Sequence, residues 1–61
     1  MRYLVQVSLA HHEYQTRCAT DKWNQAVLNY NAINIGGRYT KRLVEVQEDG
    51  KFKVISRVKG S

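Results

Sequence analysis

His11, His12 and Cys18 are the residues of this chain whose types could hold a metal ion. A structural zinc site needs about four convergent ligands. The two histidines are adjacent, so their side chains diverge in a strand or turn, and the sequence offers no fourth ligand beside Cys18. We therefore expect a polar turn at residues 10–12 and no metal site. Cys18 is the only cysteine, and a buried small hydrophobe is a commoner role for such a residue than a reactive thiol.

Carboxylates and glycines offer two further routes to chemistry. Glu45, Glu48 and Asp49 lie close together in the sequence, but general acid–base catalysis requires groups that converge in a pocket. Gly36 and Gly37 follow a predicted helix, whereas a phosphate-binding loop places its glycines before one. We expect no enzymatic activity, no cofactor and no metal, because 61 residues leave little room for an active-site pocket.

Positive charge is the clearest chemical signal of the chain. The chain has ten Lys and Arg residues and five Asp and Glu residues, which gives a net charge of +5 and a pI of about 9.7. Seven of the ten basic residues lie between Arg38 and Lys59, so residues 38–59 carry +4 and residues 1–37 carry +1. This balance favours a nucleic acid or an acidic protein surface as partner. The alternative is that the charge only keeps a small protein in solution.

Two strands and a helix are predicted in the first half of the chain. Residues 2–9 alternate between apolar and polar side chains, and residues 13–19 repeat this alternation more weakly. Thr20 and Asp21 can begin a helix, through a hydroxyl that caps a backbone N–H and a carboxylate in the first turn. The helix is predicted to end at Gly36 and Gly37. One apolar stripe runs along it, formed by Trp23, Ala26, Val27 and Tyr30.

A hairpin is predicted over residues 38–47 and 51–58. A three-residue loop of Glu48, Asp49 and Gly50 pairs residues of like character, whereas a two-residue loop would set apolar residues against charged ones. We therefore predict a type I turn with a G1 bulge and Gly50 in the left-handed region. The predicted pairs are Val46 with Phe52, Glu45 with Lys53, Val44 with Val54, and Leu43 with Ile55.

These elements predict a single α+β domain over residues 1–61, in which one helix packs on one face of a four-stranded antiparallel sheet in the order ββαββ. The sequence does not fix the strand order. The expected inner face holds Tyr3, Val5, Val7, Leu9, Tyr14, Cys18, Val44, Val46, Phe52, Val54 and Val58. The expected open face holds Arg2, Leu4, Gln6, Gln15, Arg17, Tyr39, Lys41, Leu43, Glu45, Lys53, Ile55 and Arg57.

The open face is the predicted binding surface, because one helix cannot cover both sides of the sheet. Leu4, Leu43 and Ile55 would form an apolar centre within a charged rim, which is typical of a protein-binding patch. The alternative is that scattered exposed aliphatic residues are normal, with Lys and Arg stems covering them. The residues predicted to contact a partner are Arg2, Leu4, Gln6, Arg17, Tyr39, Lys41, Leu43, Lys53, Ile55 and Arg57.

Two other uses of this face remain open. Its cations could contact nucleic-acid phosphates, although only Tyr39 among the aromatic residues is expected there, and sheet-type readers of single strands place two or three aromatic side chains on the open face. A homodimer could instead cover the apolar centre by symmetry.

In size, order of elements and lack of catalytic groups, the chain resembles small phage-encoded inhibitors of bacterial machinery, such as anti-CRISPR and phage antitoxin-like proteins. The resemblance covers the whole chain and is architectural. It rests on the strand at residues 3–7, the helix at residues 21–28 and the hairpin between Leu43 and Ile55. It implies that the protein blocks a larger bacterial protein or nucleoprotein complex, such as a nuclease, a surveillance complex or a polymerase.

The start of the chain alternates instead of forming an apolar run, and no apolar stretch approaches the roughly 18 residues of a membrane span. We expect a cytoplasmic protein without membrane contact, located in the host cell if it is phage-encoded.

Overall fold

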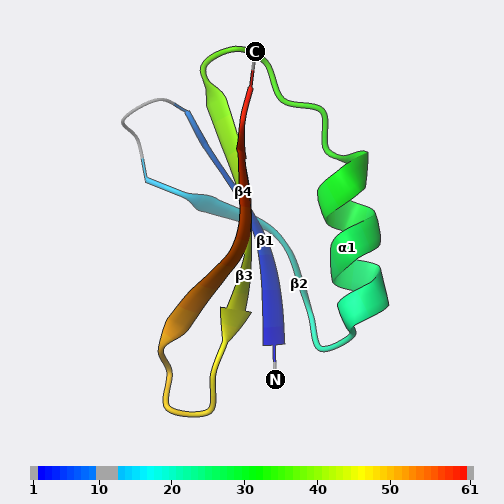
Figure 1. The fold of residues 1–61 in the computed structure, drawn as a ribbon, viewed down its shortest axis with the longest axis vertical. Helices are drawn as coiled ribbons and strands as arrows, with labels where there is room; N and C mark the ends of the chain where they lie inside the picture. The colour runs from blue at the N-terminus through cyan, green and yellow to red at the C-terminus, as the bar shows by residue number, and fades with distance from the viewer. Residues whose placement is uncertain (1, 10–12, 61) are drawn as a thin grey trace.

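The fold is a four-stranded antiparallel sheet with one helix against one of its faces, as seen in a computed structural model that describes residues 2–9 and 13–60 (Figure 1). The strand order is β2-β1-β3-β4. The predicted α+β class is confirmed, and the turn expected at residues 10–12 lies outside the described residues. The elements are β1 (Arg2–Leu9), β2 (Gln15–Thr20), α1 (Trp23–Ala32), β3 (Tyr39–Val46) and β4 (Phe52–Lys59).

β1 is a central strand, and its alternation separates the two faces of the sheet. Val5 is fully buried and belongs to a core cluster with Ala26, Tyr30 and Leu43. Val5 pairs with Cys18 on one side and with Leu43 on the other. Because directly paired residues of an antiparallel sheet share a face, Cys18 and Leu43 lie on the helix side with Val5. Gln6, the next residue, is on the opposite, open side.

The helix begins later and ends earlier than predicted. Lys22 is its N-cap residue, without a side-chain hydrogen bond at the cap, and Asp21 precedes the first turn. The Thr20 hydroxyl accepts a hydrogen bond from the Lys22 N–H at 3.1 Å, and α1 starts at the following residue, Trp23. The helix ends at Ala32, before Gly36 and Gly37. Of its predicted apolar stripe, Ala26 and Tyr30 are buried and Val27 packs against the core, whereas Trp23 is 45% exposed. α1 packs on β1, β2 and β3, and it reaches β4 through a hydrogen bond between the Tyr30 hydroxyl and Ser56 Oγ at 3.1 Å.

The turn between β3 and β4 confirms the predicted three-residue loop. The predicted pairs of Val46 with Phe52, Glu45 with Lys53 and Val44 with Val54 are all observed. The Gly50 N–H donates to the Gln47 carbonyl at 2.9 Å, and Gly50 has a φ of 87°, a conformation that a glycine adopts without strain. The predicted pair of Leu43 with Ile55 is wrong, because Leu43 pairs with Ser56.

Two single-residue bulges account for part of the differences between the predicted and observed faces. The partners of Val5 and Gln6 on β2 are Cys18 and Thr16, so Arg17 is an extra residue. On β4 the partners of Val44 and Leu43 are Val54 and Ser56, so Ile55 is extra. A bulge shifts the alternation by one residue, and every side chain beyond it changes face.

The assignment of the hairpin to the two faces was wrong as well. Leu43, predicted on the open face, is 2% exposed and lies beneath the helix. The alternation of β3 places Tyr39, Lys41 and Glu45 on the same helix side. Four residues predicted to face the helix lie on the open face instead: Val44, Val46, Phe52 and Val54. Both faces of this hairpin carry apolar side chains, so its internal pairing does not reveal which face meets the helix.

Candidate functional site

The open face carries four basic residues and no carboxylate among the described strand residues. Arg2, Arg42, Arg57 and Lys59 lie there according to the register of the sheet. The remaining residues of this face are Leu4, Gln6 and Ser8 on β1, Tyr14, Thr16 and Ala19 on or just before β2, Thr40, Val44 and Val46 on β3, and Phe52 and Val54 on β4.

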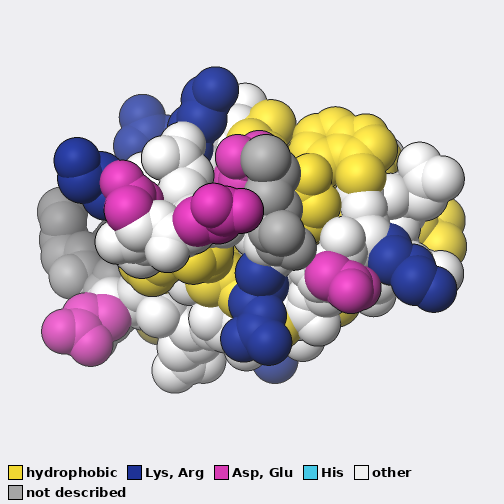
Figure 2. All heavy atoms as spheres, turned by 90° about the horizontal axis from the view of Figure 1, so that it is seen from below, with side chains coloured by type: hydrophobic (Ala, Val, Ile, Leu, Met, Phe, Trp, Pro, Cys, Tyr) yellow, Lys and Arg dark blue, Asp and Glu magenta, His cyan; other side chains and the backbone are white. Residues whose placement is uncertain are grey.

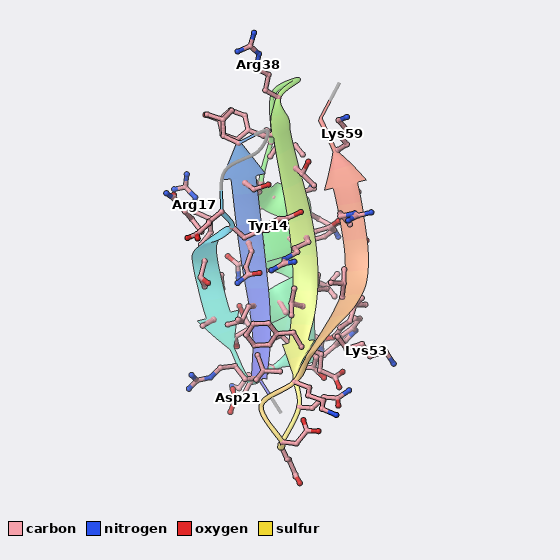
Figure 3. All side chains as sticks on the ribbon, turned by 90° about the vertical axis from the view of Figure 1, so that its left-hand side faces the viewer. Tyr14, Arg17, Asp21, Arg38, Lys53 and Lys59 are labelled. Atoms are coloured by element: carbon pink, nitrogen blue, oxygen red, sulfur yellow. The ribbon has the colours of Figure 1, made fainter. Side chains whose placement is uncertain are left out.

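Arg42 is held in place by side chains from two neighbouring strands. Its Nε donates to Gln6 Oε1 at 2.7 Å, and Gln6 Nε2 donates in turn to Thr16 Oγ1 at 3.1 Å. The Arg42 guanidinium carbon lies 3.7 Å from the centre of the Tyr14 ring. Figure 3 shows the Tyr14 side chain on the side of the sheet away from the helix. The Arg42 guanidinium is therefore oriented by a hydrogen bond and by a cation–π contact.

Arg57 lies directly opposite Arg42 on β4, and Lys59 lies opposite Thr40 two residues further on. Like charges facing one another across two strands destabilise a sheet. No carboxylate of the described strand residues shares this face, so no acidic side chain there offsets the charges of Arg42 and Arg57. The Arg42 guanidinium is directed toward Gln6 and Tyr14, and an anionic ligand that spans β3 and β4 would accept hydrogen bonds from Arg42 and Arg57. We call Tyr14, Arg42, Arg57 and Lys59 the basic half of the open face.

The part of the open face nearer the β3–β4 turn is apolar. Val44 is fully buried among its neighbours, whereas Phe52 is 60% exposed and Val54 is about half exposed. We call this part the apolar half, formed by Leu4, Val44, Val46, Phe52 and Val54.

The acidic residues lie away from the basic half. Glu48 and Asp49 form the β3–β4 turn, and Asp21 lies at the same end of the molecule, opposite to the end that carries Arg38 and Lys59 (Figure 3). Figure 2 looks onto this turn end, where acidic, basic and hydrophobic side chains are mixed. Glu45 faces the helix side, and Glu13 lines a groove on that side. The electrostatic potential is therefore expected to be most positive over the basic half.

The predicted partner-binding residues fall into three groups. Those that lie on the open face as predicted are Arg2, Leu4, Gln6 and Arg57. Those on the helix side are Tyr39, Lys41, Leu43 and Lys53. Arg17 and Ile55 are the extra residues of the two bulges. Sequence reasoning missed Tyr14 because no local signal marks the bulge at Arg17. It missed Arg42 and Phe52 because the hairpin was assigned to the opposite face, and Lys59 because the last strand was predicted to end at residue 58.

Arg17 and Tyr39 line a groove on the helix side, beyond the C-terminal end of the helix. This groove has a volume of about 370 Å³, and its other walls are Val7, Gly36 and residues 33–35. It is separated from the basic half by the sheet itself, so these two residues do not contribute to one binding surface with Arg57.

Lys41 has a structural role that the sequence did not reveal. Its Nζ donates to the carbonyl oxygens of Tyr30 and Ile33, at 2.9 and 3.1 Å, and lies 4.6 Å from the centre of the Tyr30 ring. These carbonyls are at the C-terminal end of α1, where backbone oxygens lack helical partners and attract a cation. Lys41 thus fastens the helix end to β3.

Replacing Lys41 with Met should lower the free energy of unfolding by about 1–2 kcal/mol, because two hydrogen bonds from a charged donor are lost while the apolar stem is kept. Urea denaturation followed by circular dichroism measures the change. Lys53→Met is the matched control on the same side of the sheet, and it should change the unfolding free energy by less than half as much. If the two variants lowered the free energy of unfolding equally, the contact of Lys41 with the helix end would make no specific contribution to stability.

The alternatives considered for metal and thiol chemistry gain no support from the geometry. Cys18 is half-buried and packs against the core. Across residues 2–9 and 13–60, no group of three or more His, Cys, Asp or Glu side chains is arranged to hold a metal ion. His11 and His12 lie outside the described residues. The described part of the chain also has no helix that is long and apolar enough to span a membrane.

Comparisons of the chain with protein-family models, with curated proteins and with solved structures found no match.

Proposed function

We propose that this protein is a small non-catalytic domain that binds single-stranded nucleic acid on the open face of its sheet. The observation that carries the proposal is the arrangement of charge: four cations share this face with no carboxylate among the described strand residues, and two of the cations face each other directly. Phosphate contacts of Lys and Arg supply most of the sequence-independent affinity of nucleic-acid-binding proteins.

The basic half would bind the sugar–phosphate backbone. Arg42 uses Nε for its bond to Gln6, and its Nη groups carry the N–H donors that can bind a phosphate oxygen. Arg57 opposite and Lys59 nearby would contact the same or the neighbouring phosphate. A guanidinium that is already oriented loses less side-chain entropy on binding than a free one.

The aromatic residues of this face support single-stranded rather than double-stranded nucleic acid. Phe52 offers an exposed ring, and the Arg42 guanidinium stacked on Tyr14 offers a second flat surface. Unpaired bases stack on aromatic rings and on Arg guanidinium planes. Only Tyr39 was expected on this face, so the observed positions of Tyr14 and Phe52 remove the main argument against nucleic acid.

The apolar half favours a second candidate function, contact with a larger protein or nucleoprotein complex. This is the function implied by the resemblance to phage inhibitors, with the exposed parts of Phe52 and Val54 taking the place of Leu43 and Ile55 in the apolar centre. The cations around it would then select an acidic partner surface.

Fluorescence anisotropy with a labelled 12-nucleotide single strand tests the first function. Phe52→Ala is expected to weaken binding by about 5- to 100-fold, because stacking of one base on an aromatic ring is worth about 1–3 kcal/mol. Val58→Ala is the matched control, since Val58 is also an exposed apolar residue of β4 but pairs with Lys41 on the helix side. It should leave the affinity unchanged.

Three comparisons make this experiment decisive. The logarithm of the association constant should fall with the logarithm of salt concentration with a slope of about −2 to −3, as expected for three or four phosphate contacts on a single strand. A duplex of the same length should bind more weakly. If poly-glutamate of equal charge displaces the oligonucleotide as well as unlabelled oligonucleotide does, the face recognises negative charge in general, and the protein-binding candidate is favoured instead.

A further inference from the structure

β4 is an edge strand, and its outer edge pairs with no other strand of the described residues. It pairs with β3 on one side only, and α1 contacts it through the Tyr30 hydroxyl, which lies 3.1 Å from Ser56 Oγ on the helix side of the sheet and not at the outer edge. Seven of its eight residues are exposed, the exception being Ser56. The outward backbone N–H and C=O groups of such a strand are a template for pairing with another extended chain.

The side chains of β4 combine exposed apolar residues with positive charge. Half of the large exposed hydrophobic residues in the described structure belong to this strand: Phe52, Val54, Ile55 and Val58. Lys53, Arg57 and Lys59 alternate with them, and residues 51–60 include no Asp or Glu. An added strand would therefore meet apolar side chains and cations on both faces of the sheet, with Arg57 and Lys59 on the open face and Lys53, opposite Glu45, on the helix side.

The opposite edge of the sheet does not share these properties. β2 contacts α1, and none of the large exposed hydrophobic residues lies on it. Its six residues include one cation, Arg17, which is the extra residue of a bulge. The two edges thus differ in length, cover and charge, and β4 is the one suited to binding.

A second copy of β4 is a poor occupant of this edge. Self-pairing would bring the three cations of one strand against the three of the other, and like charges across a strand pair are destabilising. Lysine residues on an edge are a recognised protection against such association. The bulge at Ile55 adds to this protection, because the bulge interrupts the regular spacing of backbone N–H and C=O groups along the edge between Val54 and Ser56.

We propose that the free edge of β4 accepts an extended acidic segment of a partner protein as a fifth strand of the sheet. Backbone hydrogen bonds would supply affinity, and Asp or Glu side chains of the segment would contact Arg57 and Lys59 on the open face and Lys53 on the helix side. This interaction goes beyond nucleic-acid binding and uses the outer edge of the sheet, although Arg57 and Lys59 would take part in both. Lys53 distinguishes peptide binding at the edge from nucleic-acid binding on the open face, since Lys53 lies on the helix side of the sheet.

A synthetic probe tests this proposal without knowledge of the natural partner. The probe is a capped seven-residue peptide, Val-Glu-Glu-Val-Val-Glu-Glu, which carries Glu on both faces of an extended strand. It is titrated into the protein and followed by two-dimensional NMR and amide hydrogen exchange. We expect saturable shifts along β4 and at least tenfold slower exchange of those β4 amides that point away from β3. Lys53→Gln should weaken the peptide two- to fivefold and leave the oligonucleotide affinity unchanged, whereas Arg17→Gln on the other edge should affect neither.

Two control peptides separate strand addition from simple charge attraction. In the first, the Val residues are N-methylated, which removes backbone donors and keeps the charge; it should bind at least tenfold more weakly. In the second, Lys replaces Glu, and it should not bind. The proposal is overturned if the N-methylated peptide binds as tightly as the probe, if the exchange protection falls on β2, or if the probe does not bind at millimolar concentration.

Discussion

Arg57→Glu is expected to weaken single-strand binding by about 10- to 100-fold while raising the melting temperature by about 2–6 °C. Loss of one charge-assisted phosphate contact accounts for the lower affinity. The gain in stability arises because residue 57 faces Arg42 across the strand pair, so that a repulsive pair becomes an attractive one. A cross-strand charge pair is worth about 0.2–1 kcal/mol, and about 1 kcal/mol moves the melting temperature of a domain this small by several degrees.

Thermal melts followed by circular dichroism, together with oligonucleotide anisotropy, measure both effects on one sample. Arg57→Gln removes the repulsion without adding an attraction, so its melting temperature should fall between those of the wild type and Arg57→Glu. Lys22→Glu makes the same change in net charge just before the helix and should weaken the oligonucleotide by less than threefold. A lower melting temperature with unchanged binding in Arg57→Glu would contradict the placement of Arg57 opposite Arg42 in a binding site.

Leu43→Ala is expected to leave most of the protein unfolded at 37 °C. Leu43 is packed against Val5, Ala26 and Tyr30 in the core beneath the helix, and truncation of a buried Leu costs about 2–5 kcal/mol. The total stability of a domain of this length is about 3–9 kcal/mol, so one such cavity removes much of it. A charged residue at this position should prevent folding altogether.

Leu28→Ala is the matched control for this variant, because Leu28 is 65% exposed on the outer side of α1. It should change the unfolding free energy by less than about 0.5 kcal/mol. Urea denaturation of the two variants gives the comparison. If Leu43→Ala were as stable as Leu28→Ala, Leu43 would lie on the open face, and the assignment of the two faces given above would be wrong.

The element order and the hairpin turn could be predicted because they depend on local patterns. The alternation of residues 2–9 and the apolar stripe from Trp23 to Tyr30 each fix one element and its buried side. The turn depends on Gly50 and on the pairing of like residues next to it. In each case the physical cause is contained within about ten residues of the sequence.

The two faces of the hairpin could not be predicted, because they depend on contacts between distant residues. Leu43 lies beneath the helix since its strand pairs with Val5, and Lys41 is held by carbonyl oxygens of α1. Neither contact can be predicted from the order of apolar and polar residues within residues 39–46. The predicted pairing within the hairpin was therefore mostly right, while the side that it presents to the helix was wrong.

The bulges explain which site residues were found and which were missed. Arg17 shifts the alternation of β2, which brings Tyr14 to the open face although Cys18 faces the helix. Ile55 shifts the alternation of β4, so that Lys53 and Arg57 lie on opposite sides. Two errors affect the predicted side of Arg57: the hairpin was assigned to the wrong face, and the bulge at Ile55 was not predicted. Each error reverses the predicted side of a residue beyond position 55, so together they leave Arg57 on the correct face. No bulge changes the side on which Arg42 lies, so only the wrong assignment of the hairpin affected it, and Arg42 was missed.

The most direct test of single-strand binding by the open face is an NMR titration that maps the contact surface. A ¹⁵N-labelled sample receives the 12-nucleotide single strand, and both backbone amides and Arg side-chain Nε–H signals are followed. We predict the largest shifts for the Nε–H signals of Arg42 and Arg57 and for the amides around Phe52, while the amides of Ala26 and Tyr30 in the helix stay in place. Shifts confined to the helix or to the groove beside Arg17, or no shifts at all, would contradict nucleic-acid binding by the open face.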